Sequence, residues 1–340
     1  MTYFELVSYA FKKFGILRAM RTGVPTALYY ATRPALPESE KPALFTMNIM
    51  PPMMTVWYHL VQKNIGDRVD LTIFDSSGTL KQKDFPNARV QKMMNFYAAT
   101  KSDEFLYHIA RKRKIGWICD DDMFIINSKA VDLVEQSLSK PHTASFSFRP
   151  RDWWHFDIDG KEYMPSSSYC TAFNREIYCD KEQLSLSPCD GNNHVSHIGS
   201  PLSRFDTFDK ANETLIKKGY TCDILPIEKQ GEYVIGYSGM SSAVMMLWHF
   251  TTPEQMMNYL EAPKKDAWKG NTLFTILSGL LAIADLQDMH QTIKGLPYHL
   301  RSMPSKKELD RLRKKHEPLL REGKTFDTVS DVSKVLRAAL

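Results

Sequence analysis

Residues 115–126 read Ile-Gly-Trp-Ile-Cys-Asp-Asp-Asp-Met-Phe-Ile-Ile, so three consecutive aspartates, Asp120, Asp121 and Asp122, interrupt an apolar run that is typical of a buried strand. Three adjacent carboxylates disfavour being ionised together unless a cation lies nearby. A hard divalent cation with oxygen ligands, and a phosphate on its far side, is the usual solution. The alternative is a metal-free turn with solvated acids, which the apolar flanks make costly. The stretch therefore predicts a strand whose end carries the functional centre.

The segments that precede this stretch alternate between strand and helix patterns. In chain order they are strand 43–50, helix 53–63, strand 69–74, helices 88–100 and 103–114, and the strand that begins at 115. This alternation is typical of an α/β protein with a mostly parallel sheet and helices on its faces. Ligands bind beyond the carboxyl ends of the strands in such sheets. Asp75 and the aspartate triplet both fall at such ends.

Two polar segments in the second half of the chain are further candidates for a site. One holds Arg149, Arg151, Trp153 and Trp154, of which the arginines suit phosphates and the indoles suit either sugar rings or the core. The other begins a helix predicted over residues 205–219, with Asp206 as its N-cap.

The chain is expected to divide into three regions. Residues 1–40 form an N-terminal helical arm with a proline-rich linker, residues 41–252 form the main domain, and residues 253–340 form a helical extension. The main domain divides into halves 41–130 and 131–252. A helix pattern over residues 3–20 has apolar residues on one side and basic residues on the others. It either docks on the main domain or lies on an anionic membrane.

Composition narrows the class of partner and the compartment. The chain has 340 residues and a formal net charge of +5, which suits an anionic ligand or membrane surface but is too weak to indicate nucleic acid. Its five cysteines include no CxxC pair, which indicates free thiols in a reducing compartment. The first residues lack a signal-peptide pattern, and the apolar segment 273–286 is too short to span a bilayer. We expect a cytoplasmic protein, peripheral on the inner face of a membrane if the first helix binds lipid.

Several of these segments together resemble glycosyltransferases of the GT-A fold, a Rossmann-like fold, with a layout similar to family 2 enzymes. The resemblance covers residues 41–250. It rests on the strand Ala43–Met50, on Ile73-Phe-Asp75, on the DxD motif Asp120-x-Asp122, on Tyr169-Cys-Thr-Ala-Phe-Asn-Arg175 and on the helix from Phe205 to Gly219-Tyr220. The chain departs from the family at the start of that helix, where Asp206 and Asp209 stand in place of the usual Glu-Asp pair.

The resemblance implies a metal-dependent, inverting glycosyltransferase. The enzyme would move a sugar from a nucleotide-sugar, most simply a UDP-sugar, to a hydroxyl of a glycan or lipid-linked acceptor. Mn²⁺ or Mg²⁺ would be the cofactor. The resemblance implies that the metal is bound by Asp122, Asp120 and His249, with His194 or His197 as the alternatives to His249. It implies that the donor is bound by Asn48, Asp75, Asp120, Asp121, Arg149 and Trp153. The general base would be Asp206, or else Asp209 or Asp190.

Two other functions remain open from the sequence. A sugar nucleotidyltransferase shares a similar sheet and metal-binding acids, but usually has a glycine-rich, basic loop after the first strand. That position holds Asn48-Ile-Met-Pro-Pro52, with neither glycine nor lysine. A non-catalytic carbohydrate-binding protein with the same fold is the other alternative.

Overall fold

A computed structural model of the chain describes residues 16–94 and 97–340. The predicted helix 3–20 therefore lies largely outside the described residues. The chain forms two compact units. The first comprises residues up to Ile49, Gln62–Asp120 and Asn127–Val234, and the second comprises Met50–Val61, Asp121–Ile126 and Ile235–Leu340.

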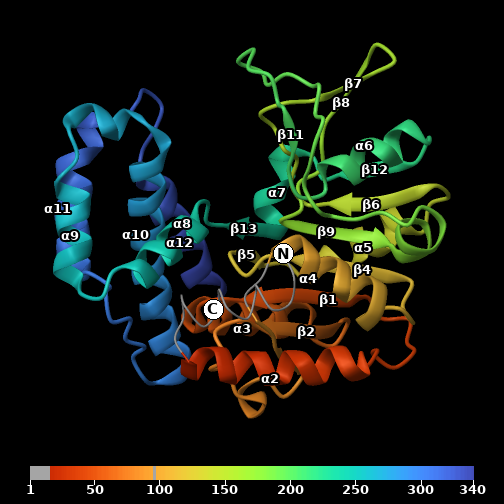
Figure 1. The fold of residues 1–340 in the computed structure, drawn as a ribbon, viewed down its shortest axis with the longest axis horizontal. Helices are drawn as coiled ribbons and strands as arrows, with labels where there is room; N and C mark the ends of the chain where they lie inside the picture. Colours follow the sequence, from red (N-terminus) through yellow and green to blue (C-terminus); the bar gives the residue numbers. More distant parts are fainter. Residues whose placement is uncertain (1–15, 95–96) are drawn as a thin grey trace. The chain divides into compact units, whose positions relative to one another are not determined.

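The first unit is built on a seven-stranded sheet with the strand order β12-β6-β9-β4-β1-β2-β3 (Figure 1). Its strands are β1 (Ala43–Asn48), β2 (Asp70–Asp75), β3 (Ala88–Lys92), β4 (Ile115–Cys119), β6 (Thr143–Ser147), β9 (Cys170–Asn174) and β12 (Thr221–Ile224). All neighbouring strands are parallel except β9, which is antiparallel to both β4 and β6. The predicted class, an α/β protein with a mostly parallel sheet flanked by helices, is confirmed.

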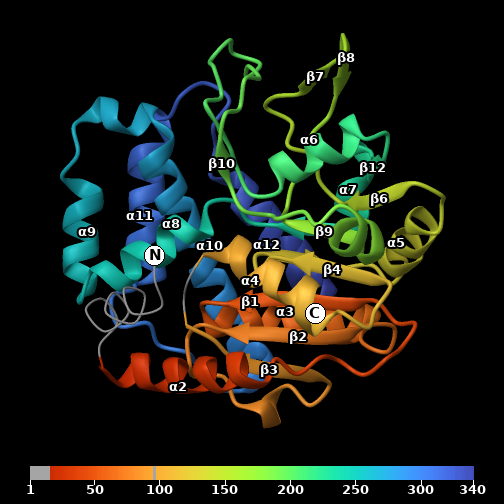
Figure 2. The same ribbon diagram turned by 45° about the vertical axis from the view of Figure 1, so that its right-hand side comes forward.

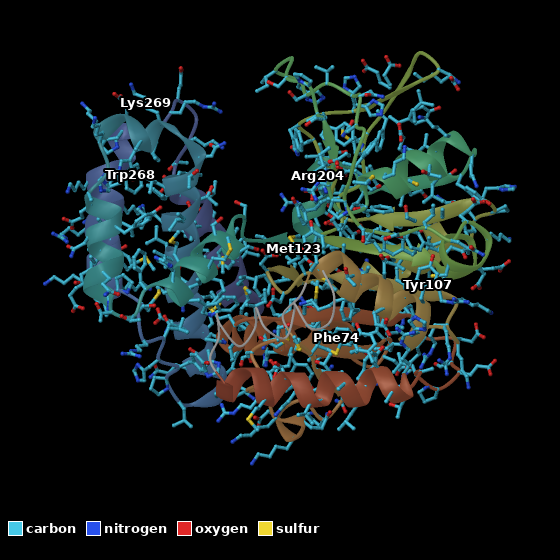
Figure 3. The ribbon with its side chains drawn as sticks, viewed as in Figure 1. Phe74, Tyr107, Met123, Arg204, Trp268 and Lys269 are labelled. Atoms are coloured by element: carbon cyan, nitrogen blue, oxygen red, sulfur yellow. The ribbon has the colours of Figure 1, made fainter. Side chains whose placement is uncertain are left out.

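The helices of this unit are α2 (Ile16–Thr32), α4 (Ala98–Glu104), α5 (Ala130–Leu138), α6 (Asp209–Lys217) and α7 (Ile227–Tyr233), with π-helical turns at Phe105–Ile109 and Glu176–Lys181 and a 3-10 turn at Gln82–Asp84. Helix α2 runs alongside β3 (Figure 2). An aromatic cluster packs against the sheet: Phe45 meets Phe74 edge-on at 4.8 Å and stacks on Phe105 at 4.7 Å between ring centroids. Phe74 is marked in Figure 3. These rings anchor the strands that position the candidate site.

The prediction of a helix over residues 88–100 is wrong. Residues Ala88–Lys92 form strand β3, which pairs in parallel with β2 from Leu71 to Asp75, and α4 begins only at Ala98. Most of β3 is only half-buried. Its polar residues have no strong intrinsic preference, so pairing with β2 decides their conformation.

A small subdomain of the first unit follows β6. It contains the short strands β7 (Phe156–Ile158), β8 (Lys161–Tyr163), β10 (Cys189–Asp190) and β11 (Arg204–Phe205). Its apolar cluster is formed by Trp154, Phe156, Ile158 and Phe205. Of the two candidate indoles, Trp154 is thus a core residue, whereas Trp153 is 48% exposed.

The second unit is mainly helical. It contains α8 (Met240–His249), α9 (Pro253–Glu261), α10 (Asn271–Lys294), α11 (Lys306–His316) and α12 (Asp327–Ala339), together with most of α3 (Pro51–Ile65) and the strand β5 (Met123–Ile125). Helix α3 includes Pro51 and Pro52 in its first turn, where proline is tolerated. Trp268, which is labelled in Figure 3, stacks on His316 with ring centroids 3.9 Å apart.

Helix α10 is the centre of this unit. It packs against α8, α11 and α12, and the approach to α8 is close: a Cβ on Gly279 would lie 2.6 Å from the Cβ of Ala243. Among the described residues, α10 is the one helix long and apolar enough to cross a membrane, but 67% of its most apolar window is buried inside the protein. A buried central helix accounts for that composition.

Candidate active site

The carboxyl ends of β1 and β2 form one part of the site. Asn48 and Asp75 are the last residues of these strands and are paired in register. Asp75 is fully buried, and both of its carboxylate oxygens accept hydrogen bonds. Oδ1 accepts from Asn48 Nδ2 at 2.8 Å and from the Ser77 backbone N–H and Oγ at 3.0 and 2.6 Å, and Oδ2 accepts from the Leu80 N–H at 2.9 Å. This carboxylate therefore shapes the turn that follows β2.

Replacing Asp75 by Ala is expected to destabilise the protein by about 3 kcal/mol, because several buried donors lose a charged acceptor at once. Urea unfolding measures the change. Asp84→Ala in the same connection is the matched control, since Asp84 is exposed, and it should change stability by no more than about 0.5 kcal/mol. Equal effects of the two variants would contradict the assigned role of Asp75.

A buried lysine also lies at this end of the sheet. Lys101 is 2% exposed, and its Nζ donates to Ser76 Oγ at 3.1 Å, one residue beyond Asp75. No sequence pattern indicates this role for Lys101, because a lysine between two predicted helices is usually a solvated surface residue. Only its burial reveals that it supports the turn.

The aspartate triplet connects β4 to β5. The backbone N–H of Asp120 donates to the carbonyl of Tyr169 at 2.7 Å, just before β9. Asp121 is 8% exposed, whereas Asp120 and Asp122 are partly exposed. The two outer carboxylates are thus more open to solvent than the middle one.

The backbone that follows the triplet is held from two sides within the second unit. The carbonyl of Asp122 accepts the Tyr237 N–H at 3.1 Å, and the carbonyl of Met123 accepts Trp57 Nε1 at 2.8 Å. Gly236 leaves no room for a side chain, since a Cβ there would lie 2.7 Å from the Asp122 carbonyl oxygen. These contacts fix where the Asp122 backbone lies.

The triplet fits a hard divalent cation by its chemistry. No group of three or more His, Cys, Asp or Glu side chains within residues 16–94 and 97–340 is arranged to hold a metal. Mg²⁺ and similar ions, however, are usually held by one or two carboxylates and complete their coordination with water and substrate phosphates. Carboxylates such as those of the triplet are the ligand type that these ions take. His249, the predicted third ligand, is exposed at the end of α8.

Arg151 organises the other part of the site. It is 4% exposed and forms ion pairs with two carboxylates, with Nη1 3.1 Å from Asp206 Oδ2 and Nε 2.9 Å from Asp209 Oδ1. Nη2 donates to the Thr207 carbonyl at 3.2 Å. The guanidinium also lies over the ring of Tyr169, 5.9 Å from its centroid. Tyr169 thus touches Arg151 through its ring and Asp120 through its backbone.

The two aspartates beside Arg151 differ in burial. The Asp206 side chain is 59% exposed, whereas that of Asp209 is 2% exposed. Burial raises the pKa of Asp209 to about 6, although the Arg151 charge and the Asp206 N–H oppose that rise. Of the two, only Asp206 is open to a substrate.

The predicted role of Asp206 as N-cap is wrong. Helix α6 begins at Asp209, and its cap position is Phe208, which has a left-handed backbone (φ 73°). An N-cap side chain would accept an N–H from the first turn of the helix, but here the Asp206 N–H donates to the side chain of Asp209, at 3.0 Å from Oδ2. Asp206 Oδ1 accepts the N–H of its neighbour Thr207 at 2.7 Å. The Asp206 carboxylate is therefore not engaged in starting the helix.

The remaining predicted residues lie in other surroundings. His194 is placed between the Asp157 N–H, at 3.3 Å from Nδ1, and Glu213, at 3.0 Å from Nε2. Burial opposes ionisation of Glu213, but hydrogen bonds from Lys210, Lys217 and His194 lower its pKa to about 2. His194 is thus a packed link between the small subdomain and α6. His197 contacts His155, with Nε2 and Nδ1 3.1 Å apart, and Asp190 is exposed on β10 opposite Arg204.

The first unit therefore brings together Asp120, Tyr169, Arg151, Asp206 and Asp209. Of these, Asp120, Asp206 and Asp209 were predicted site residues, and Arg151 and Tyr169 were noted in polar or family-like segments. The sequence gives no sign that Tyr169 links the other groups, because that contact depends on the antiparallel insertion of β9 between β4 and β6.

No protein-family model and no curated protein sequence matches the chain. Among solved structures, it is similar to a mannosyltransferase from Pyrobaculum calidifontis in complex with GDP-Man and Mn²⁺ (14% identity, TM-score 0.38, 98% of this chain and 97% of that chain). It is also similar to the bifunctional glycosyltransferase WbbM (10% identity, TM-score 0.34, 58% of this chain and 41% of that chain). A third similar structure is a 4-diphosphocytidyl-2C-methyl-D-erythritol synthase from Anaerococcus prevotii (9% identity, TM-score 0.34, 55% of this chain and 88% of that chain). Glycosyltransferases are thus among the solved structures to which the chain is similar.

Proposed function

We propose that the protein is a metal-dependent glycosyltransferase that moves a sugar from a nucleotide-sugar to a hydroxyl of a glycan or lipid-linked acceptor, with inversion. One observation carries the proposal. Asp120 is bonded to the Tyr169 backbone, the Tyr169 ring lies against Arg151, and Arg151 holds the exposed carboxylate of Asp206. A carboxylate suited to a metal–diphosphate and a carboxylate suited to a base therefore share one edge of the sheet.

On this proposal, residues 41–130 serve mainly the donor and residues 131–252 mainly the acceptor. Asp122 and Asp120 would hold Mn²⁺ or Mg²⁺, and water and the donor phosphates would complete its coordination; the predicted third ligand, His249, is not grouped with them. The ion, when bound, offsets the negative charge that develops on the leaving diphosphate. The turn built by Asn48 and Asp75 supports the nucleoside, and Asp121 is a further donor-binding residue. Arg149 faces the phosphates, and Trp153 offers an exposed ring to a sugar.

Asp206 is the proposed general base. It accepts the proton of the acceptor hydroxyl while that oxygen bonds to the anomeric carbon and the bond from that carbon to the diphosphate breaks. Asp209 is buried and positions Asp206 by accepting its backbone N–H. Asp190, the other candidate, is exposed on β10.

Asp122→Ala is expected to abolish the Mn²⁺-dependent rise in Tm that a nucleoside diphosphate produces in the wild-type protein, because binding to the folded state alone raises Tm. Thermal unfolding with UDP or GDP, with and without Mn²⁺, measures this. Asp331→Ala is the control, since Asp331 is an exposed aspartate of α12. A Mn²⁺-dependent shift that survives in Asp122→Ala would place the metal elsewhere.

A second assay separates the proposed reaction from the alternatives. The protein is incubated with UDP- and GDP-sugars and Mn²⁺, and the released products are identified. Release of a nucleoside diphosphate supports glycosyl transfer to acceptor or water. Formation of a nucleoside triphosphate only when pyrophosphate is added would instead indicate a nucleotidyltransferase. No product from any donor, and no change in Tm with nucleotide and metal, would indicate a non-catalytic protein.

A further inference from the structure

One face of α2 carries a row of exposed apolar side chains. Met20, Val24 and Leu28 are 57%, 58% and 64% exposed. Their spacing of four residues places them on the same side of the helix. Single exposed apolar residues are ordinary, but three in a row on one helix form a stripe that water solvates poorly. We call this row the α2 stripe.

The opposite face of α2 is held by the first unit. Thr22, Thr26 and Tyr29 are buried, with exposures of 4%, 1% and 2%. Thr26 Oγ1 accepts the Met94 N–H at 2.8 Å, and the Tyr29 hydroxyl donates to Glu104 at 2.9 Å. The helix is thus attached through this face, whereas the side chains of the α2 stripe are exposed. Helix α2 itself runs beside β3 (Figure 2).

The sequence around the α2 stripe is basic, although one of its arginines, Arg33, is paired with Glu104. Between Glu5 and Glu38 the sequence contains five basic residues and no acidic one. Arg21 is exposed on α2 itself. The turn after β2 lies against it, since a Cβ on Gly78 would be 3.2 Å from the Arg21 Cβ, and this turn leads to the exposed residues Lys81, Lys83 and Asp84.

We propose that α2 docks this protein on an anionic phospholipid bilayer, with the α2 stripe inserted at the level of the headgroups. An apolar row flanked by basic residues is the combination that holds a helix in the membrane interface, where apolar area is buried and cations meet anionic lipid. The excess of basic residues favours an anionic lipid surface over an apolar protein surface that carries no acidic residues. The docking does not depend on the proposed glycosyl transfer.

Flotation of the full-length protein with vesicles tests the proposal without any sugar nucleotide. The wild-type protein is expected to bind vesicles that contain about one-third phosphatidylglycerol, and to bind pure phosphatidylcholine vesicles weakly. The triple variant Met20→Gln, Val24→Gln, Leu28→Gln should bind the anionic vesicles at least about tenfold more weakly. Arg21→Glu should weaken binding about fivefold or more. All variants are first checked for an unchanged Tm.

The matched control replaces three exposed apolar residues elsewhere, Ile198, Ile227 and Leu296, by Gln; these are 89%, 56% and 69% exposed. It should bind as the wild-type protein does. Equal loss in both triple variants, or full binding by the α2 variant, would overturn the proposal. So would a wild-type dimer in solution that the α2 variant alone abolishes, because the stripe would then be covered by a second copy of the chain.

Discussion

Asp206→Asn is expected to lower kcat by about 10²- to 10⁴-fold while leaving the affinity for donor nucleotide unchanged, because the amide cannot accept the proton of the acceptor hydroxyl. The Asp206 side chain is largely exposed, so the substitution should barely change the free energy of unfolding. Transfer to a soluble acceptor gives kcat, and titration with nucleoside diphosphate and Mn²⁺ gives the affinity.

Asp190→Asn is the matched control for this experiment. Asp190 is also exposed, on β10, and precedes Asp206 in the chain. We expect it to retain nearly full activity. If Asp190→Asn lost transfer and Asp206→Asn kept it, the base would be Asp190 and the Arg151 cluster would have another purpose.

Arg151→Met is expected to destabilise the protein by about 3–5 kcal/mol, since it leaves the buried carboxylate of Asp209 without its compensating charge. The double variant Arg151→Met, Asp209→Asn should recover part of this loss, because it no longer buries an uncompensated charge. Urea unfolding of the wild type, both single variants and the double variant closes a thermodynamic cycle. A double variant less stable than Arg151→Met would contradict the pairing.

The same variants should respond differently to pH. The folded pKa of Asp209, about 6, is above its usual value of 3.8, so the folded state binds this proton more tightly than the unfolded state. Its contribution to stability is therefore largest below about pH 4 and is lost as pH rises through about 6. Loss of Arg151 raises this pKa further. The stability difference between wild type and Arg151→Met should then be larger at pH 8 than at pH 5, and should not grow with pH in the Asp209→Asn background.

Much of the fold can be predicted because the alternation of apolar runs and amphipathic segments is local. The strand at residue 43, the strand that leads to the triplet and the carboxyl-end positions of Asp75 and Asp120 all follow from that alternation. The strand at residues 88–92 does not, since a half-buried edge strand with mixed polar residues has no clear hydrophobic period.

The connections within the site are harder to predict because they are not local. Tyr169 reaches Asp120 only because β9 runs antiparallel between two strands that are distant in sequence. Both carboxylate oxygens of Asp75 accept hydrogen bonds because the turn after β2 closes around them. The sequence cannot reveal this, because an aspartate at a strand end has the same pattern when it is open to a ligand. The capping assignment of Asp206 failed for a similar reason: the left-handed residue Phe208 takes the cap position, two residues after Asp206.

The interleaving of the two units constrains how the chain can fold during its synthesis. The second unit combines residues 50–61 and 121–126 with residues 235–340, and His290 Nδ1 lies 2.9 Å from Thr55 Oγ1 across that separation. At the usual rate of synthesis, the two early segments leave the ribosome on the order of ten seconds before their partners. During that interval, apolar residues such as Trp57 and Phe124 lack the helices that bury them. In a nascent chain stalled before residue 235, these apolar residues therefore stay uncovered next to the aspartate triplet, where chaperones can bind them.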